Sequence, residues 1–121
     1  MQKELAISVF EVVGSPLCVA SGDGQGVYER LAAAIVQDRR VTLSFRNISA
    51  LTSAFLNAAI GQLYGKFSED KIRALLKVED MQQEDLALLK RVVETAKEYF
   101  RDPRRFEQAV RDELGGEGDD K

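Results

Sequence analysis

The chain has 121 residues, of which 45% are hydrophobic and 31% charged, and its formal net charge is -3 at pH 7. This size predicts one domain with its own core, and the acidic balance argues against a nucleic-acid-binding protein, which needs a concentrated basic face. Histidine is absent and Cys18 is the single cysteine, which excludes histidine-dependent catalysis, an internal disulfide and a multi-cysteine metal site. We therefore expect a protein that is not an enzyme and that uses neither a cofactor nor a metal.

The sequence also bears on the cellular location of the protein. No apolar run approaches the roughly 20 residues that a membrane-spanning helix needs. The N-terminal residues lack the pattern of a signal peptide, because Glu4 interrupts them and no long apolar core follows. We therefore expect a cytoplasmic protein without a membrane partner.

In chain order, the first expected element is a strand over residues 5–13, in which apolar residues alternate. Residues 14–16, Gly-Ser-Pro, predict a turn. A short strand over residues 17–20 is then expected to return antiparallel to the first. Cys18 lies in this apolar run, which is typical of a buried and unreactive thiol.

Three glycines, Gly22, Gly24 and Gly26, alternate along the next segment. A glycine-rich loop between a strand and a helix is the context of phosphate-binding loops, although this spacing matches neither the dinucleotide fingerprint nor the P-loop. We expect a helix from this loop to about residue 38, with Asp23 as its cap. One interpretation is a small-ligand or nucleotide site formed by the glycines and Asp23. The alternative is a flexible turn whose glycines permit positive φ.

Residues 41–67 predict a strand followed by an amphipathic helix. Alternation over residues 41–46 gives the strand one apolar and one polar face. Apolar residues then recur at helical spacing: Leu56, Ile60, Leu63 and Phe67. Thr52 or Ser53 is the expected N-cap. Since a helix N-terminus favours negative charge, a hydroxyl at this corner is also a candidate phosphorylation site.

A bare stripe runs along the same helix, where Asn57, Gly61 and Gly65 lie four residues apart. Two glycines within a helix cost about 2 kcal/mol relative to alanine, so a close neighbour is expected to pack there. The neighbour is either another helix of the same domain or a protein partner. Phe55 lies outside the apolar stripe, so we expect it to be partly exposed and to anchor a partner.

The C-terminal third contains further periodic segments. Residues 68–70 predict a polar connection, and alternation over residues 72–78 favours another strand, although a short apolar run can also be helical. The spacing of apolar residues over 83–100 predicts a helix.

Asp102 and Pro103 are expected to end that helix and to begin a last one over residues 103–114. Residues 115–121 are polar and glycine-rich, and we expect a disordered tail. Residues 1–114 would then form one domain.

The expected order of elements is therefore β-β-α-β-α-β-α-α. Strands in a doubly wound sheet are apolar on both faces, whereas residues 41–46 keep a polar face. We therefore expect an α/β fold with a small mixed sheet of about four strands and helices mainly on one face. The other face would be partly open, and right-handed crossovers would join the parallel strands.

The stretch VTLSFRNISALTSAFLNAAIGQLYGKF and the later LLKRVVETAKEYF are similar to uncharacterised bacterial STAS-like domains. These are relatives of the sulfate-transporter and anti-sigma-factor-antagonist domains. The resemblance covers residues 5–100 and implies a mixed sheet with helices on one face. In the anti-sigma antagonists a serine at a helix start, within an Asp-Ser-Ser-Gly type turn, is phosphorylated by a partner kinase of the histidine-kinase-like ATPase fold. That phosphorylation switches partners.

At the matching place this chain has Thr52-Ser53-Ala54-Phe55, so the acidic residue, the second serine and the glycine of that turn are absent. We expect a non-enzymatic regulatory module that binds a protein, with Ser53 or Thr52 as the phosphorylation candidate. The resemblance implies a histidine-kinase-like ATPase as a partner, and the sequence leaves a homodimer open. The expected partner surface comprises four residues: Ser53, Phe55, Asn57 and Gly61.

Overall fold

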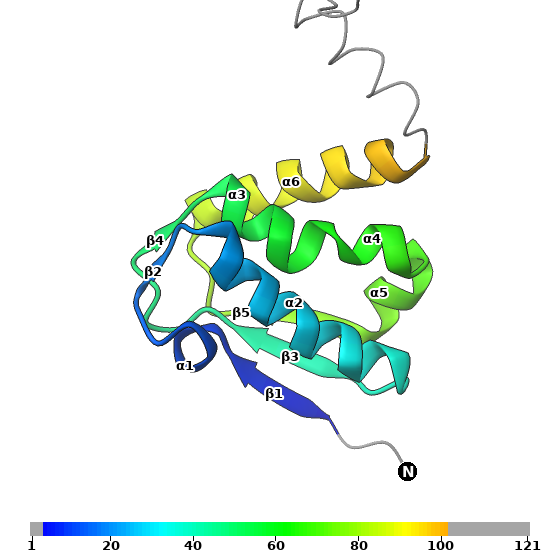
Figure 1. Ribbon diagram of the computed structural model, residues 1–121, viewed down its shortest axis with the longest axis horizontal. Coiled ribbons are helices and arrows are strands. Elements are labelled where there is room, and N and C mark those ends of the chain that lie inside the picture. The colour runs from blue at the N-terminus through cyan, green and yellow to red at the C-terminus, as the bar shows by residue number, and fades with distance from the viewer. Residues whose placement is uncertain (1–3, 102–121) are drawn as a thin grey trace, which may run out of the picture.

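The computed structural model of the protein describes residues 4–101 and places a sheet beneath a layer of helices (Figure 1). The strands are β1 (Leu5–Ser8), β2 (Leu17–Cys18), β3 (Val41–Ser44), β4 (Ala50–Leu51) and β5 (Leu76–Glu79). The helical segments are α1 (Val9–Val13), α2 (Ser21–Val36), α3 (Ser53–Leu56), the π-helical η1 (Asn57–Gly61), α4 (Leu63–Lys66), α5 (Glu69–Leu75) and α6 (Gln83–Arg101). The expected α/β fold is confirmed.

The main sheet has three parallel strands in the order β1–β3–β5, with Leu43 of β3 between Ile7 of β1 and Val78 of β5. Residues on its helix-facing side are buried or half-buried, with Leu43 fully so. The opposite row is small or polar and more exposed: Ala6, Ser8, Thr42, Ser44, Lys77 and Glu79. The expectation of one covered and one partly open face is therefore confirmed.

Segments α3, η1 and α4 follow one another as a single rod that begins at Ser53 and ends at Lys66. Its inner stripe of Leu56, Ile60 and Leu63 is buried, as the spacing predicts. The cap is Thr52, whose Oγ1 accepts a hydrogen bond from the Phe55 N–H at 3.1 Å. The helix start was therefore correctly placed from the sequence.

The expected strand over residues 5–13 is too long, because β1 ends at Ser8 and α1 follows directly. Ser8 Oγ accepts a hydrogen bond from the Glu11 N–H at 3.2 Å. Gly14 ends the helix in the left-handed conformation at φ 78°. Ser8 followed three residues later by Glu11 has the capping-box spacing. This local pattern predicts the start of α1.

The expected antiparallel hairpin of residues 5–13 with 17–20 is wrong. β2 pairs in parallel with β4, with Leu17 opposite Ala50 and Cys18 opposite Leu51. The two strands form a separate sheet at the end of the molecule where β1 finishes (Figure 1). The physical reason is that α1 intervenes, so the chain does not reverse through the tight turn that a hairpin needs.

The expected strand over residues 72–78 begins as a helix. α5 runs to Leu75, and β5 follows as a parallel edge strand beside β3. Residues 68–70 are not a loose connection, because Ser68 caps α5 by accepting the Lys71 N–H at 3.1 Å. An ion pair between Arg73 and Glu69, one turn apart at 2.6 Å, supports the same helix.

The expected helix over residues 83–100 is confirmed as α6, whose buried residues are Val92 and Ala96. The expected helix over 103–114 and the tail over 115–121 lie outside the described residues. Between residues 4 and 101, no helix combines the length and the apolar character that a membrane crossing requires.

Candidate functional site

The strand–helix corner lies where α2 and α3 both begin (Figure 1). Thr52 Oγ1 donates a hydrogen bond to the Val19 carbonyl at 2.8 Å while it accepts the Phe55 N–H. The hydroxyl therefore ties the start of α3 to the segment that leads into α2. Because both of its hydrogen-bonding functions are used, Thr52 has a structural role.

Ser53 is the other candidate hydroxyl, and it is exposed at the first position of α3. Within residues 4–101 no hydrogen bond occupies its hydroxyl. Ala54 beside it is also exposed. Of the two candidate phosphorylation sites, Thr52 and Ser53, Ser53 is therefore the accessible one.

Phe55 is fully buried, so the expectation of a partly exposed anchor is wrong. The cause is a close crossing of α2 over α3. A Cβ on Gly24 would lie 2.5 Å from the Phe55 carbonyl oxygen and 2.9 Å from the Ala58 Cβ. Because Gly24 has no side chain, α2 approaches closely enough to cover a face of the rod that the spacing alone leaves open.

The glycines at 22–26 are not a loop. α2 begins at Ser21, so these glycines form its first turns. Asp23 is not the cap, since the cap position is Ala20 and no side chain bonds there. Gly24 serves the helix crossing, whereas a Cβ on Gly22 would meet nothing within 4 Å.

Helix α6 packs along the bare stripe on the rod and buries Gly61. A Cβ on Gly61 would lie 3.6 Å from the Ala96 Cβ, and Gly65 packs against the ring of Phe100. Of the two expected neighbours, a helix of the same domain is therefore the one present. Gly61 is buried and does not belong to an accessible partner surface, whereas Asn57 is exposed.

Two shallow grooves meet at Ala54 and Asn57. The α3–α6 groove, of about 560 Å³, is lined by Ser53, Ala54, Asn57, Leu88, Arg91, Val92 and Thr95. The α2–α3 groove, of about 400 Å³, is lined by Ser21, Gly22, Gln25, Ala54, Asn57, Ala58 and Gln62. Ala54 and Asn57 line both grooves. With three exposed residues that each line one groove, they form what we call the corner surface: Ser21, Gly22, Ser53, Ala54 and Asn57. The structure thus brings Gly22 beside Ser53 and Asn57, although the sequence pattern predicts two separate sites for them.

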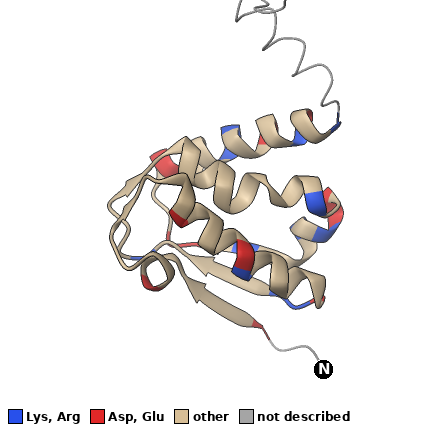
Figure 2. Ribbon diagram, viewed as in Figure 1, with Lys and Arg blue, Asp and Glu red and all other residues tan. Residues whose placement is uncertain are grey.

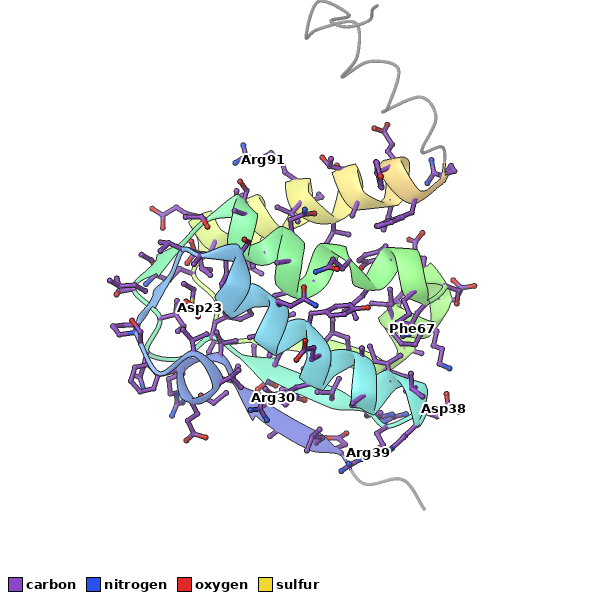
Figure 3. All side chains as sticks on the ribbon, viewed as in Figure 1. Asp23, Arg30, Asp38, Arg39, Phe67 and Arg91 are labelled. Carbon is purple, nitrogen blue, oxygen red and sulfur yellow. The ribbon has the colours of Figure 1, made fainter. Side chains whose placement is uncertain are left out.

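The corner surface carries no charge of its own. Residues 12–22 and 47–65 contain no acidic or basic side chain, and the ribbon there is tan in Figure 2. Asp23 on α2 and Arg91 on α6 stand at its borders (Figure 3). Sequence reasoning missed Arg91 and Leu88, because the approach of α6 to α3 is a long-range contact.

A family model described as a STAS-like domain of unknown function (DUF4325) matches residues 23–86. The chain belongs to this family. The family expected from the sequence is therefore confirmed. Comparison with curated proteins and with solved structures gave no match.

The matched region of this STAS-like domain runs from the first turn of α2 to the first turn of α6. It contains β3, β5 and the whole rod, and with them Ser53 and Asn57. Most of α6 lies beyond it, including Arg91. Most of the α2–α3 groove therefore lies within the family match, with Ser21 and Gly22 just before it, and the α3–α6 groove is completed by α6.

Cys18 lies beneath the corner and is fully buried. Burial, together with the nearby Asp23 carboxylate, raises the pKa of its thiol to about 11. A thiol with this pKa is almost wholly protonated at neutral pH. The expectation of a buried thiol is confirmed, and the raised pKa fits an unreactive one.

Proposed function

We propose that this STAS-like domain is a non-enzymatic regulatory module that binds a protein partner through the corner surface. The observation that carries the proposal is the sharing of Ala54 and Asn57 by two grooves. A single projecting segment of a partner would contact both grooves from one position over these residues. Small exposed side chains let such a segment approach the helix backbone closely.

The chemistry of the grooves supports a protein rather than a nucleotide. The α2–α3 groove has no cation in its lining, and the acidic side chain in the first turn of α2 is Asp23. A phosphate placed at the start of α2 would meet this carboxylate without a compensating cation. An uncharged surface with polar Ser53 and Asn57 side chains suits hydrogen bonding and close packing against a protein.

Phosphorylation of Ser53 is the switch that we propose for this surface. A phosphate would add about -1.5 to -2 charges to an uncharged region, which would change its affinity for a partner sharply. Arg91 lines the same α3–α6 groove and provides a cation for the new group. The family resemblance supports a histidine-kinase-like ATPase as the kinase.

Photo-crosslinking tests the proposed surface directly. A photoreactive amino acid in place of Ala54 should capture the partner, which can then be identified and purified. The affinity of the purified partner is measured for the wild type and for Asn57→Arg. We expect Asn57→Arg to weaken binding at least about tenfold, because a long charged side chain would block both grooves. Glu98→Arg, an exposed charge change elsewhere on α6, is the matched control and should bind as the wild type does. Equal affinity of Asn57→Arg and the wild type would reject this surface.

The switch has a separate test. After incubation with ATP and the cognate kinase, intact-mass measurement should show the addition of one phosphate to the wild type. The addition should persist in Ser49→Ala, an exposed serine nearby, and should be lost in Ser53→Ala. A phosphate retained by Ser53→Ala would place the modified residue elsewhere and leave the binding proposal standing.

A further inference from the structure

The outer edge of β1 has no neighbouring strand within the described residues, since the sheet order is β1–β3–β5. The Leu5 N–H donates to the Arg40 carbonyl at 2.8 Å. Backbone groups in a ladder alternate between the two sides of a strand, so the N–H and C=O of Ala6 point away from β3. A free edge of this kind is a template for another strand.

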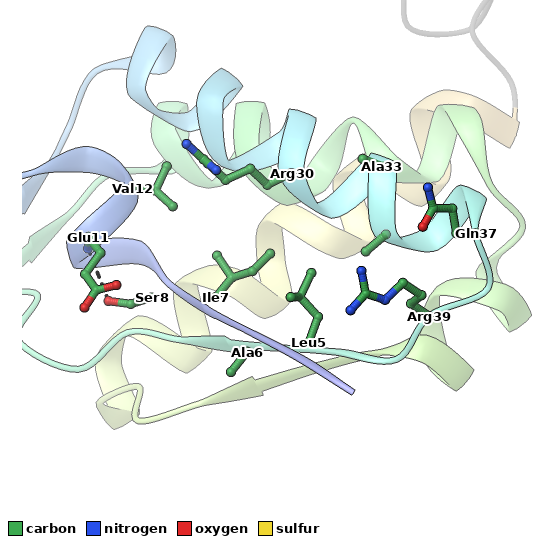
Figure 4. A pocket seen from close by; sticks show the side chains of 11 residues that line it. Leu5, Ala6, Ile7, Ser8, Glu11, Val12, Arg30, Ala33, Gln37 and Arg39 are labelled. Atoms are coloured by element: carbon green, nitrogen blue, oxygen red, sulfur yellow. Dashed lines mark hydrogen bonds between the residues drawn. The ribbon is translucent and has the colours of Figure 1, made fainter. Parts of the chain in front are cut away.

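A groove of about 580 Å³ runs beside this edge, between β1 and α2 (Figure 4). Leu5 and Ile7 of β1 form one side, and Arg30 of α2 reaches over it from the other. Glu11 lies at the end where β1 finishes, and Arg39 lies at the opposite end, where β1 begins. The Arg30 side chain points toward the Glu11 end, so the groove has a basic end at Arg39 and an end with both signs of charge.

Three charged residues line this groove: Glu11, Arg30 and Arg39. None of them has an ion-pair partner among residues 4–101. One neighbouring charge outside the groove is paired: Arg40 lies 3.9 Å from Glu4. Unpaired charges that flank a free strand edge mark a surface that can gain ion pairs when another strand docks.

We propose that β1 is a self-association surface on which a second copy of this chain pairs its own β1 antiparallel. The two sheets would join into one of six strands around a two-fold axis. With Ala6 opposite Ala6 of the second copy, their outward N–H and C=O groups bond reciprocally. Leu5 then lies opposite Ile7 on the helix-facing side, where both grooves receive apolar side chains.

The positions of Glu11 and Arg39 favour a second copy of this chain as the binding partner of β1. An antiparallel two-fold brings the beginning of β1 in one copy to the end of β1 in the other, so Arg39 of each copy approaches Glu11 of the other. An isologous contact of this type is self-complementary, and each copy supplies both signs of charge. β1 and α3 lie on different sides of the domain (Figure 1), so the pairing leaves the corner surface of both copies open.

A charge-reversal cycle tests the pairing. Sedimentation velocity of the full chain over a range of concentrations should show a monomer–dimer equilibrium. Glu11→Arg and Arg39→Glu should each raise the dimer Kd at least about tenfold, because each places like charges together twice per dimer. The double variant should return the Kd to within about threefold of the wild type. Glu98→Arg, an exposed charge on α6, should leave it unchanged.

Ala6→Pro tests the strand pairing itself. It removes an N–H that the β1–β3 ladder does not use, so the variant should remain folded by circular dichroism and lose the dimer. A wild type that stays monomeric at every concentration overturns the proposal. A double variant whose dimer Kd is as high as that of the single variants also overturns it. Hydrogen exchange of the Ala6 amide, measured with and without residues 102–121, tests the other occupant. If the protein is a monomer and this amide loses protection when those residues are removed, the chain's own C-terminal segment covers the edge and the dimer proposal is overturned.

Discussion

Two helices flank the rod, and they hold it in different ways. α2 buries six residues, including Leu31 and Ile35, whereas the longer α6 buries only Val92 and Ala96. At the α2 crossing, Gly24 lies against backbone atoms of the rod, whereas the glycines beneath α6 lie against side chains. Backbone atoms cannot move aside without deforming a helix, but exposed side chains can rotate. The α2 contact is therefore rigid and the α6 contact adaptable, and the α3–α6 groove lies at the adaptable one.

The largest expected difference between the two contacts comes from truncating a buried residue of each helix. Leu31→Ala should lower the free energy of unfolding by about 3 kcal/mol, because it leaves a cavity in the fully enclosed core. Val92→Ala should cost about 1 kcal/mol, because fewer buried atoms are removed where α6 can settle onto the rod. Urea unfolding of both variants measures the two values. Equal losses would show that α6 is held as tightly as α2.

Alanine at Gly24 sharpens the comparison at the point of contact. Gly24→Ala should cost about 2 kcal/mol, because its Cβ would overlap the Phe55 carbonyl and the helices would have to separate. Gly22→Ala, in open space in the same helix, is the control and should be neutral or stabilising by up to about 1 kcal/mol. Thermal unfolding of the pair gives the difference. A neutral Gly24→Ala would mean that the crossing is not rigid.

Gly61→Ala is the matching change beneath α6, and we expect its effect to lie within about 1 kcal/mol of zero. The new Cβ would meet the Asn57 side-chain oxygen, which is exposed and can rotate away, and would contact Ala96 at an ordinary distance. Removal of a glycine from a helix offsets the adjustment. A loss as large as that of Gly24→Ala, measured in the same unfolding experiment, would contradict the adaptable character of this contact.

The smallest effect concerns the ion pair between α5 and α6. A hydrogen bond from Lys97 at 2.7 Å, supported by the charges of Lys97 and Arg73, lowers the pKa of Glu69. A carboxyl whose folded pKa lies below its unfolded value contributes stability at neutral pH and loses it as the pH falls through the folded pKa. Glu69→Gln should therefore be slightly less stable than the wild type at pH 7, and the difference should vanish in acid. A difference that does not change with pH would exclude the ion pair as its cause.

Local signals in the sequence were sufficient for part of the fold. The Thr52 cap, the inner stripe of the rod and the extent of α6 follow from spacing within one turn or a few turns of helix. The same kind of signal marks α1 and α5, through Ser8 with Glu11 and through Ser68. Alternating apolar residues predict strands across parts of both segments, but the serine caps start helices there because the alternation is short.

The remainder depends on contacts between distant segments. The parallel pairing of β2 with β4 follows from how the chain returns after β3, and the spacing of residues 17–20 carries no trace of it. Phe55 is buried because Gly24, about thirty residues earlier, lets α2 approach. The site was therefore predicted in part: Ser53 and Asn57 are exposed where they were expected, but their neighbours Gly22 and Arg91 come from other elements.

The π-helical turn η1 in the middle of the rod fixes the phase between its two halves. A π turn completes one rotation with one more residue than an α turn, whereas one extra residue in a regular α-helix adds about 100° of rotation. If residues 57–61 adopted ordinary α geometry, α3 would therefore turn about its axis relative to α4. That rotation would move Phe55 away from its buried position and Asn57 out of both grooves, although the sequence would be the same. The wide turn of this five-residue segment, as much as its side chains, determines which face the domain presents.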